Sequence, residues 1–204
     1  RPGPATTAAL LDHLRSTRLA ALRWGDRARS LRERVAFLRR SAPDGDATWP
    51  DWGDDMLLAT LDDWLGPYLG SATGAADLAR IDLDMVLGAQ FDWDTSSQLT
   101  ELAPPTLTTA NGREVAIDYS ADVPTVHVRV QDMFGTKVPP CVAGGRVPLA
   151  LALLSPADRP VQITRDLPGF WAGTWADVRK DMAGRYPKHQ WPVDPANAPP
   201  HRLK

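Results

Sequence analysis

The strongest candidate for chemistry in this sequence is a basic segment near the C-terminus. Its cationic side chains are Arg179, Lys180, Arg185, Lys188 and His189, and Arg202 and Lys204 extend it toward the last residue. Guanidinium and ammonium groups neutralise the phosphates of a nucleic acid without reading its sequence. Cations also stabilise the C-terminal end of a helix through its dipole. The segment therefore predicts either a nucleic-acid contact or a locally stabilised helix end, and the sequence leaves both open.

Motifs for nucleotide hydrolysis are absent from the sequence. It contains no Gly-x-x-x-x-Gly-Lys-Ser/Thr loop, whose backbone N–H groups would hold phosphates, and no Asp-Glu-Ala-His box. The Gly-rich run at residues 143–146 lacks the following Lys and hydroxyl residue, so we expect a bend before a strand. We therefore expect no catalytic residue, no cofactor site and no ATPase activity in this chain alone.

The histidines and the single cysteine do not form the pattern of a metal site. His13, His127, His189 and His201 are far apart, and none is paired at i, i+4 with a Glu between. Structural zinc sites usually take several cysteines, and Cys141 is alone. We expect His127 to be a solvated strand residue and Cys141 to be a buried or half-buried, unreactive thiol. With one cysteine no internal disulfide can form, which suits a reducing cytosol.

Eight tryptophans are a large number for 204 residues. Trp171 and Trp175 share one helical stripe with Val178 and Met182, so we expect them in the core, as we do Trp64. Trp191 lies in a segment that two prolines keep extended. It either packs on the surface of its own domain, which we favour, or offers a stacking platform for a nucleobase. Three others lie beside prolines or at helix starts and are expected to hold loops: Trp49, Trp52 and Trp93.

The elements that must position these residues change character at Pro104-Pro105. Upstream, a period of 3.6 predicts helices over residues 8–18, 26–40, 51–69, 75–80, 82–90 and 94–102. Downstream, alternation predicts strands over residues 106–110, 113–119, 125–132, 148–154 and 161–165, with Asn111-Gly112 as a type I′ hairpin turn. A helix should then begin after Asp166 and end at Gly184. We predict an α+β fold: residues 1–103 form a bundle of short helices, and residues 104–204 form a small antiparallel sheet closed by one long C-terminal helix and an extended tail.

Charge is distributed in blocks along the chain. Residues 1–40 hold ten arginines against three acidic residues, and residues 41–101 hold one arginine against thirteen. We therefore expect the arginine-rich helix over residues 26–40 to dock on the acidic helices that follow it. No apolar run approaches the length of a membrane span and no signal peptide is visible, so we expect a cytoplasmic protein without a membrane partner.

Several longer strings resemble one family. TRDLPGFW at residues 164–171, followed by ADVRKDMAGRYPKHQWPVDP at residues 176–195, resembles the extreme C-terminus of bacterial DEAH-box ATP-dependent RNA helicases of the HrpB type. Further similar strings occur in the expected order at residues 34–39, 61–69, 102–107, 117–120 and 144–149, so the resemblance covers nearly the whole chain.

The resemblance implies an accessory C-terminal region whose motor lies elsewhere in a longer chain. The parent would hydrolyse ATP with Mg²⁺ and remodel RNA, using domains upstream of residue 1, and the Arg at position 1 agrees with such a piece. Upstream helicase domains are the implied partners, and RNA is a further candidate. Two roles stay open: a domain that assists RNA binding or braces the motor, and a protein-docking or structural module without nucleic-acid contact.

Overall fold

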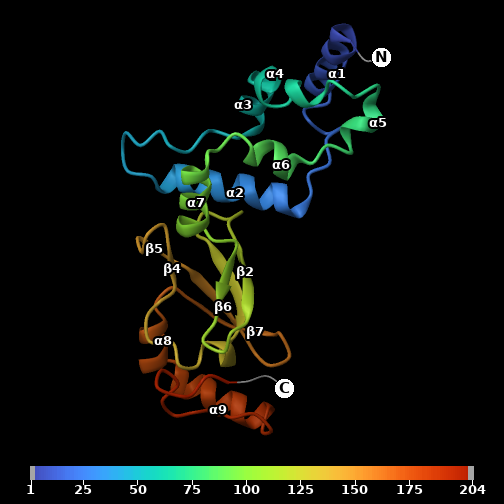
Figure 1. The fold of residues 1–204 in the computed structure, drawn as a ribbon. Helices are drawn as coiled ribbons and strands as arrows, with labels where there is room; N and C mark the ends of the chain where they lie inside the picture. The colour runs from blue at the N-terminus through green and yellow to red at the C-terminus, as the bar shows by residue number, and fades with distance from the viewer. Residues whose placement is uncertain (1–2, 202–204) are drawn as a thin grey trace. The chain divides into compact units, whose positions relative to one another are not determined.

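The computed structural model describes residues 3–201, which divide into two compact units. Unit 1 ends at Ala103 and unit 2 begins at Pro104. Unit 1 contains only helices and turns, whereas unit 2 contains a mixed sheet followed by helices (Figure 1). The chain is therefore α+β, as the sequence predicts.

Unit 1 is a set of mostly short helices around α2. In order they are α1 (Pro4–Ser16), α2 (Asp26–Ser41), α3 (Asp54–Ala59), α4 (Leu61–Trp64), the 3-10 turn η1 (Gly66–Tyr68), α5 (Ala75–Leu78), α6 (Leu83–Gly88) and α7 (Trp93–Leu102). The single helix predicted over residues 51–69 is wrong, because three short pieces occupy this stretch. Thr60 leaves helical geometry at φ −106° and ψ 18°, and Pro67 has no N–H with which to continue a helix.

Unit 2 is built on a five-stranded sheet with the order β1-β2-β3-β6-β7. The strands are β1 (Thr106–Thr108), β2 (Glu114–Asp118), β3 (Thr125–Arg129), β6 (Ala150–Leu154) and β7 (Pro160–Thr164). Strands β3 and β6 pair in parallel, so the sheet is mixed and not wholly antiparallel as predicted. A parallel neighbour requires a crossover. This one contains the 3-10 helix η2 (Val130–Met133) and a small hairpin of β4 (Cys141–Val142) and β5 (Val147–Pro148).

The alternation of side chains gives this sheet two different faces. The inner face carries the buried aliphatic residues Ile117, Val126, Val128, Leu151 and Leu153. Helices α8 (Leu167–Ala172) and α9 (Trp175–Arg185) follow β7. Thr174, between them, donates a hydrogen bond to Gln162, which is in register with Leu153 on the inner face. The turn between α8 and α9 therefore contacts the inner side of the sheet at β7.

The long C-terminal helix is divided, contrary to the prediction. It begins as predicted, because the Asp166 carboxylate accepts a hydrogen bond from Gly169 N and Pro168 lies in the first turn. Gly173 then adopts φ −108° and ψ −101°, which ends α8, and α9 begins after Thr174. Trp171, Trp175 and Met182 are nevertheless buried as one stripe.

The Asn111-Gly112 pair connects β1 and β2, but not through a two-residue type I′ turn. Thr109 N donates to Arg113 O at 2.8 Å, which leaves three residues in the loop. Gly112 has a positive φ of 83°, whereas the φ of Asn111 is not positive.

The third predicted strand ends earlier than expected, at Arg129, where η2 begins. Among residues 3–201, no helix has the length and apolar character that crossing a membrane requires.

Candidate nucleic-acid interface

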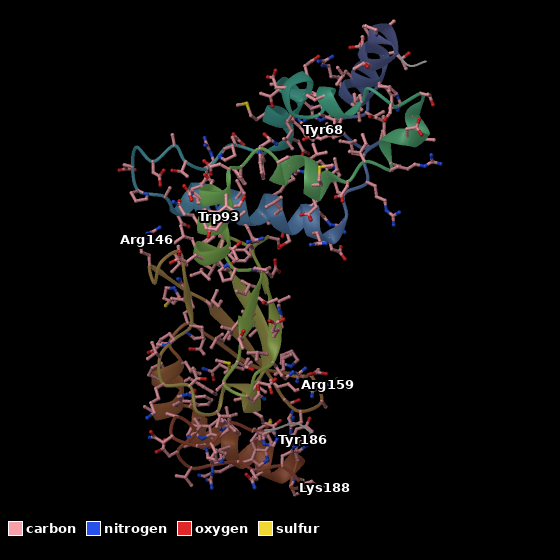
Figure 2. All side chains as sticks on the ribbon, in the orientation of Figure 1. Tyr68, Trp93, Arg146, Arg159, Tyr186 and Lys188 are labelled. Atoms are coloured by element: carbon pink, nitrogen blue, oxygen red, sulfur yellow. The ribbon has the colours of Figure 1, made fainter. Side chains whose placement is uncertain are left out.

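The predicted basic residues all lie at one end of unit 2, on α9 and on the segment after it. We call residues 186–201 the C-terminal strap. Arg179, Lys180 and Arg185 belong to α9, and Lys188 and His189 belong to the strap. Figure 2 shows Lys188 at this end, near Tyr186, where the strap leaves α9. Arg202 and Lys204 lie outside the described residues.

Two of these five residues hold the strap in place. Arg179 is half-buried, and its Nε donates to the carbonyl of Trp191 at 2.9 Å. His189 Nδ1 lies 3.1 Å from the amide nitrogen of Gln131, a fully buried residue of η2. Both side chains therefore act inside unit 2 and are not freely available to a ligand.

The other three cations face solvent. Arg185 pairs with Asp181 one helical turn earlier at 3.1 Å, and both side chains are largely exposed. An exposed pair of this kind contributes only about 0–1 kcal/mol, so Arg185 can exchange its partner readily. Lys180 and Lys188 are exposed, and within residues 3–201 neither has a carboxylate at ion-pair distance. The candidate interface is therefore reduced to Lys180, Arg185 and Lys188.

Trp191 packs into its own domain, as favoured from the sequence. Its Nε1 donates to Tyr186 O at 3.0 Å. Its ring lies edge-on to Phe134 at 6.5 Å and tilted against Trp175 at 6.4 Å, distances at which aromatic pairs attract. A half-buried ring held in this way does not serve as an open stacking platform.

Backbone atoms of the strap complete its anchoring. Trp175 Nε1 donates to Pro192 O at 3.0 Å, and Gly135 N donates to Pro195 O at 2.8 Å. The Asn111 side chain donates to His201 O at 2.8 Å. The strap contacts of Asn111 and Gln131 could not be predicted from the sequence, because their side chains bind partners 90 and 58 residues away and no local pattern signals such a pairing.

Two arginines on or beside the sheet, Arg129 and Arg113, are paired within unit 2 and do not enlarge the interface. Arg129 makes two hydrogen bonds to Asp158, at 2.7 and 2.9 Å. These bonds lower the pKa of Asp158 and raise the pKa of Arg129, because each charge stabilises the other. Arg113 lies 3.3 Å from the buried carboxylate of Asp132. Arg159, which Figure 2 labels near the β6–β7 turn, stays exposed.

The Gly-rich run does not fit a nucleotide. Ala143, Gly144 and Gly145 have φ values of 53°, 66° and 82°, and they form a tight turn between β4 and β5, the bend expected from the sequence. No Lys follows to hold phosphates, and Arg146 is exposed beyond the turn. Among residues 3–201 no group of three metal-ligating side chains occurs.

Two predictions for single residues are wrong. Cys141 is exposed, since alternation in the short strand β4 sends Val142 inward and Cys141 outward. Trp93 does not hold a loop, because 81% of its side chain is exposed at the start of α7.

Trp52 holds a loop as predicted, since its ring is buried and stacks on the ring of Phe91 with 5.0 Å between the centroids. His127 is exposed as predicted.

The arginine-rich helix α2 docks within unit 1, although carboxylates are only part of the reason. Arg32 pairs with Asp54 at 2.8 Å, and Arg27 lies 3.4 Å from Asp84. Backbone carbonyls are equally important partners: Arg32 bonds Trp52 O, Arg39 bonds Trp49 O, and Arg34 bonds Ala103 O. These arginines are therefore largely engaged in the fold of unit 1.

Comparison with known proteins points to one family. A family model described as ATP-dependent helicase C-terminal, HrpB_C, matches residues 64–195. The ATP-dependent RNA helicase HrpB of Escherichia coli (strain K12) is 43% identical over 195 residues, which are 95% of this chain and 24% of that protein.

Two solved structures agree with this comparison. The crystal structure of E. coli DExH-box NTPase HrpB has a TM-score of 0.92 and 40% identity, covering 100% of this chain and 25% of that one. The crystal structure of E. coli DEAH/RHA helicase HrpB has a TM-score of 0.78 and 38% identity, covering 94% and 24%. The chain thus spans about a quarter of the length of these relatives. Because the family model matches more than half of its residues, the chain belongs to the C-terminal domain family of HrpB-type ATP-dependent helicases.

Proposed function

We propose that this chain is the accessory C-terminal domain of a bacterial, cytoplasmic ATP-dependent RNA helicase and that it helps the parent hold RNA. The observation that carries this proposal is the set of three exposed cations, Lys180, Arg185 and Lys188, on α9 and the anchored strap. ATP and Mg²⁺ act in the upstream domains, because the motifs that would bind them are missing here.

The chemistry of this contact is charge neutralisation. Ammonium and guanidinium groups on a fixed frame bind phosphates of the RNA backbone and release counterions. The contact is independent of base sequence, since no aromatic ring on α9 or the strap is open for stacking. Arg179 and His189 are positioning residues, because they fix the strap that carries Lys188.

The test is a salt titration of RNA binding with the full-length parent. Changing Lys180, Arg185 and Lys188 together to Ala should weaken binding and reduce the slope of log affinity against log salt by about 2, at roughly 0.7 per lost single-strand contact. A matched control changes three exposed cations elsewhere in unit 2, Lys137, Arg146 and Arg165, and should leave the slope nearly unchanged. Unchanged affinity and slope in a folded triple variant would reject the RNA contact.

A second candidate function is a bracing or protein-docking module without nucleic-acid contact. Two observations favour it: Arg179 is used inside unit 2, and Asp181 partly neutralises Arg185. If the triple variant binds RNA normally, the bracing role takes the place of the RNA contact.

A further inference from the structure

A groove in unit 1 lies between helix α2 and the loop at residues 50–53. We call it the α2 groove. Its volume is about 490 Å³, which lies within the range of about 300–1,000 Å³ that is usual for ligand sites. Guanidinium groups dominate the wall that α2 contributes. They belong to Arg29, Arg32, Arg39 and Arg40.

The helical period places these arginines on one face of α2. Arg32 lies three residues after Arg29, and Arg40 lies eight residues after Arg32, so all three share a face of the helix. A second face of α2 packs into the core of unit 1. Its buried residues are Ala28, Leu31, Val35 and Leu38. The helix thus separates an apolar stripe, which stabilises unit 1, from a basic stripe, which lines the groove.

Two of the four arginines hold the walls of the groove together. Arg32 donates to Trp52 O at 3.0 and 2.7 Å and to the carboxylate of Asp54 at 2.8 Å. Arg39 donates through one nitrogen to Trp49 O at 3.0 Å. Both tryptophans are buried. These bonds fix the loop against α2, so the groove is already formed without a ligand.

The other two arginines keep their charge available to a ligand. Arg29 pairs with Asp26, three residues earlier on the same helix, at 2.6 Å, and both side chains are largely exposed. Such an exposed pair exchanges its partner readily. Arg40 is exposed, and within the part of the chain that the structure describes it has no carboxylate at ion-pair distance. Arg29 and Arg40 can therefore both bind an anion.

Two carboxylates also line the groove, Glu33 and Asp51, so its four guanidinium groups leave an excess of two positive charges. Asp51 is exposed, and its Oδ1 accepts a hydrogen bond from Gly53 N at 2.8 Å. Residues 1–103 as a whole hold more acidic residues than arginines. Exposed charges more than about 10 Å away are nevertheless largely screened at 0.1 M salt. The groove is therefore a local cationic site on an acidic unit.

The spacing of the two available cations selects an extended anion. Arg29 and Arg40 are eleven residues apart, which is about 16 Å along the axis at about 1.5 Å per residue. One phosphate or carboxylate group cannot contact both. A chain of phosphates can contact both, and its neutral parts can cross the uncharged centre of the groove at Ala36 and Pro50. Guanidinium groups suit phosphates, because they donate two parallel hydrogen bonds to them.

We propose that the α2 groove binds the backbone of single-stranded RNA through Arg29 and Arg40. This inference rests on the proposed function in that RNA is the ligand of the parent, but it assigns RNA to a second surface, on unit 1. It does not depend on the cations of α9. Phosphate contacts position a nucleic acid without reading its sequence, so the groove binds RNAs of different sequence alike.

The test is a salt titration of binding between the full-length parent and a fluorescently labelled oligouridine. The double variant Arg29→Ala/Arg40→Ala should reduce the slope of log affinity against log salt by about 1.4, at roughly 0.7 per lost single-strand contact. The matched control is Arg80→Ala/Arg23→Ala, which should leave the slope unchanged. Arg80 pairs with Asp77 three residues earlier, as Arg29 does with Asp26, and Arg23 is exposed like Arg40.

A variant that strengthens binding guards against a loss caused by misfolding. Asp51→Asn removes a negative charge from the groove and keeps the oxygen that accepts from Gly53 N. It should tighten RNA binding about twofold at low salt, because one repulsive charge beside the phosphates is lost. Asp46→Asn is the control and should not change the affinity, since Asp46 accepts from Thr48 N in the same way and does not line the groove.

The two RNA contacts can fail independently. Added to the triple Ala variant of Lys180, Arg185 and Lys188, the exchanges at Arg29 and Arg40 should lower the slope by a further 1.4 or so. If the triple variant alone has no effect, the contact of α9 is rejected, and the loss caused by Arg29→Ala/Arg40→Ala still supports the α2 groove.

Two results would overturn the proposal: an unchanged slope in the folded double variant, or an equal loss in the control pair. An acidic peptide is the alternative occupant of the groove. If oligoglutamate binds the parent and loses affinity in the double variant while RNA binding stays unchanged, the groove is a peptide site and the assignment to RNA is wrong.

Discussion

At the scale of single residues, hydrogen bonds decide which charges are free. Asp118 accepts hydrogen bonds from the Ser120 side chain at 2.6 Å and the Ser120 backbone N–H at 2.8 Å. These bonds hold the pKa of Asp118 below its usual value of 3.8, with a smaller contribution from His127, and partial burial opposes the shift. Because the folded-state pKa is lowered, the stabilisation is present above about pH 4 and is lost as pH falls through the folded pKa.

The exchange Ser120→Ala should raise the pKa of Asp118 toward its ordinary value, because the side-chain hydrogen bond makes the largest contribution to the shift. The acid-dependent loss of stability that comes from this carboxylate should shrink accordingly. An NMR titration of the Asp118 carboxyl carbon measures the midpoint directly. Ser97→Ala on α7 is the control and should not move it. An unchanged midpoint in Ser120→Ala would contradict this account.

The sequence predicts the candidate residues but not which of them are used internally. Arg179, Lys180, Arg185, Lys188 and His189 can be recognised as a basic cluster from their types and spacing. The partners of Arg179 and His189 are set by how the strap folds back on η2 and α9, which no local pattern encodes. The RNA role of the remaining cations stays a prediction.

At the scale of elements, the strap is held by an aromatic cluster as much as by hydrogen bonds. Phe134 lies 5.7 Å from Trp175, and Trp191 contacts both rings. This cluster connects the crossover after β3 with α9 and the strap. The position of Lys188 therefore depends on Trp191. Trp191 packs in the aromatic cluster, whereas Lys188 faces solvent.

Trp191→Ala should destabilise unit 2 by about 2–4 kcal/mol, because it removes a large ring from a packed cluster and leaves a cavity. Thermal unfolding of the 1–204 chain measures the loss, and hydrogen exchange should show faster exchange over residues 186–201. The matched control is Trp93→Ala. Since Trp93 is 81% exposed, this exchange should change stability by no more than about 0.5 kcal/mol. Equal effects of the two exchanges would contradict the packing described for Trp191.

Local sequence signals predict where a helix begins, but they do not predict how strands that are distant in the sequence pair with one another. Asp166 and Pro168 mark the start of α8, because capping and the N1 preference of proline are local effects. The parallel pairing of β3 with β6 depends on how residues 130–149 cross over, so alternation alone could not distinguish it from an antiparallel pair. Likewise, the break at Gly173 interrupts an otherwise continuous helical stripe, and the sequence period gives no sign of it.

At the scale of the whole molecule, the described residues form two units, and the sequence contains neither a phosphate-binding loop nor an Asp-Glu-Ala-His box. The family match covers residues 64–195, and the relatives extend far beyond the matched region. The two units differ in charge as in fold. Residues 1–103 hold eleven arginines against sixteen acidic residues, whereas residues 104–204 hold twelve lysines and arginines against nine acidic residues.

Residues 1–204 alone should hydrolyse no ATP, with or without RNA, because the sequence has no phosphate-binding loop and no acidic box. A coupled phosphate-release assay on the purified chain tests this, with the full-length parent as the positive control. RNA-stimulated hydrolysis by the isolated chain would show that the reading of it as an accessory domain is wrong.

The most direct test of the RNA contact is ultraviolet crosslinking of RNA to the full-length parent, followed by mass spectrometry of the crosslinked peptides. We expect crosslinked peptides that contain Lys180, Arg185 or Lys188, and we expect these crosslinks to disappear when the three residues are changed to Ala. An RNA-binding parent that gives crosslinks only in upstream domains, and none within residues 175–201, would contradict it.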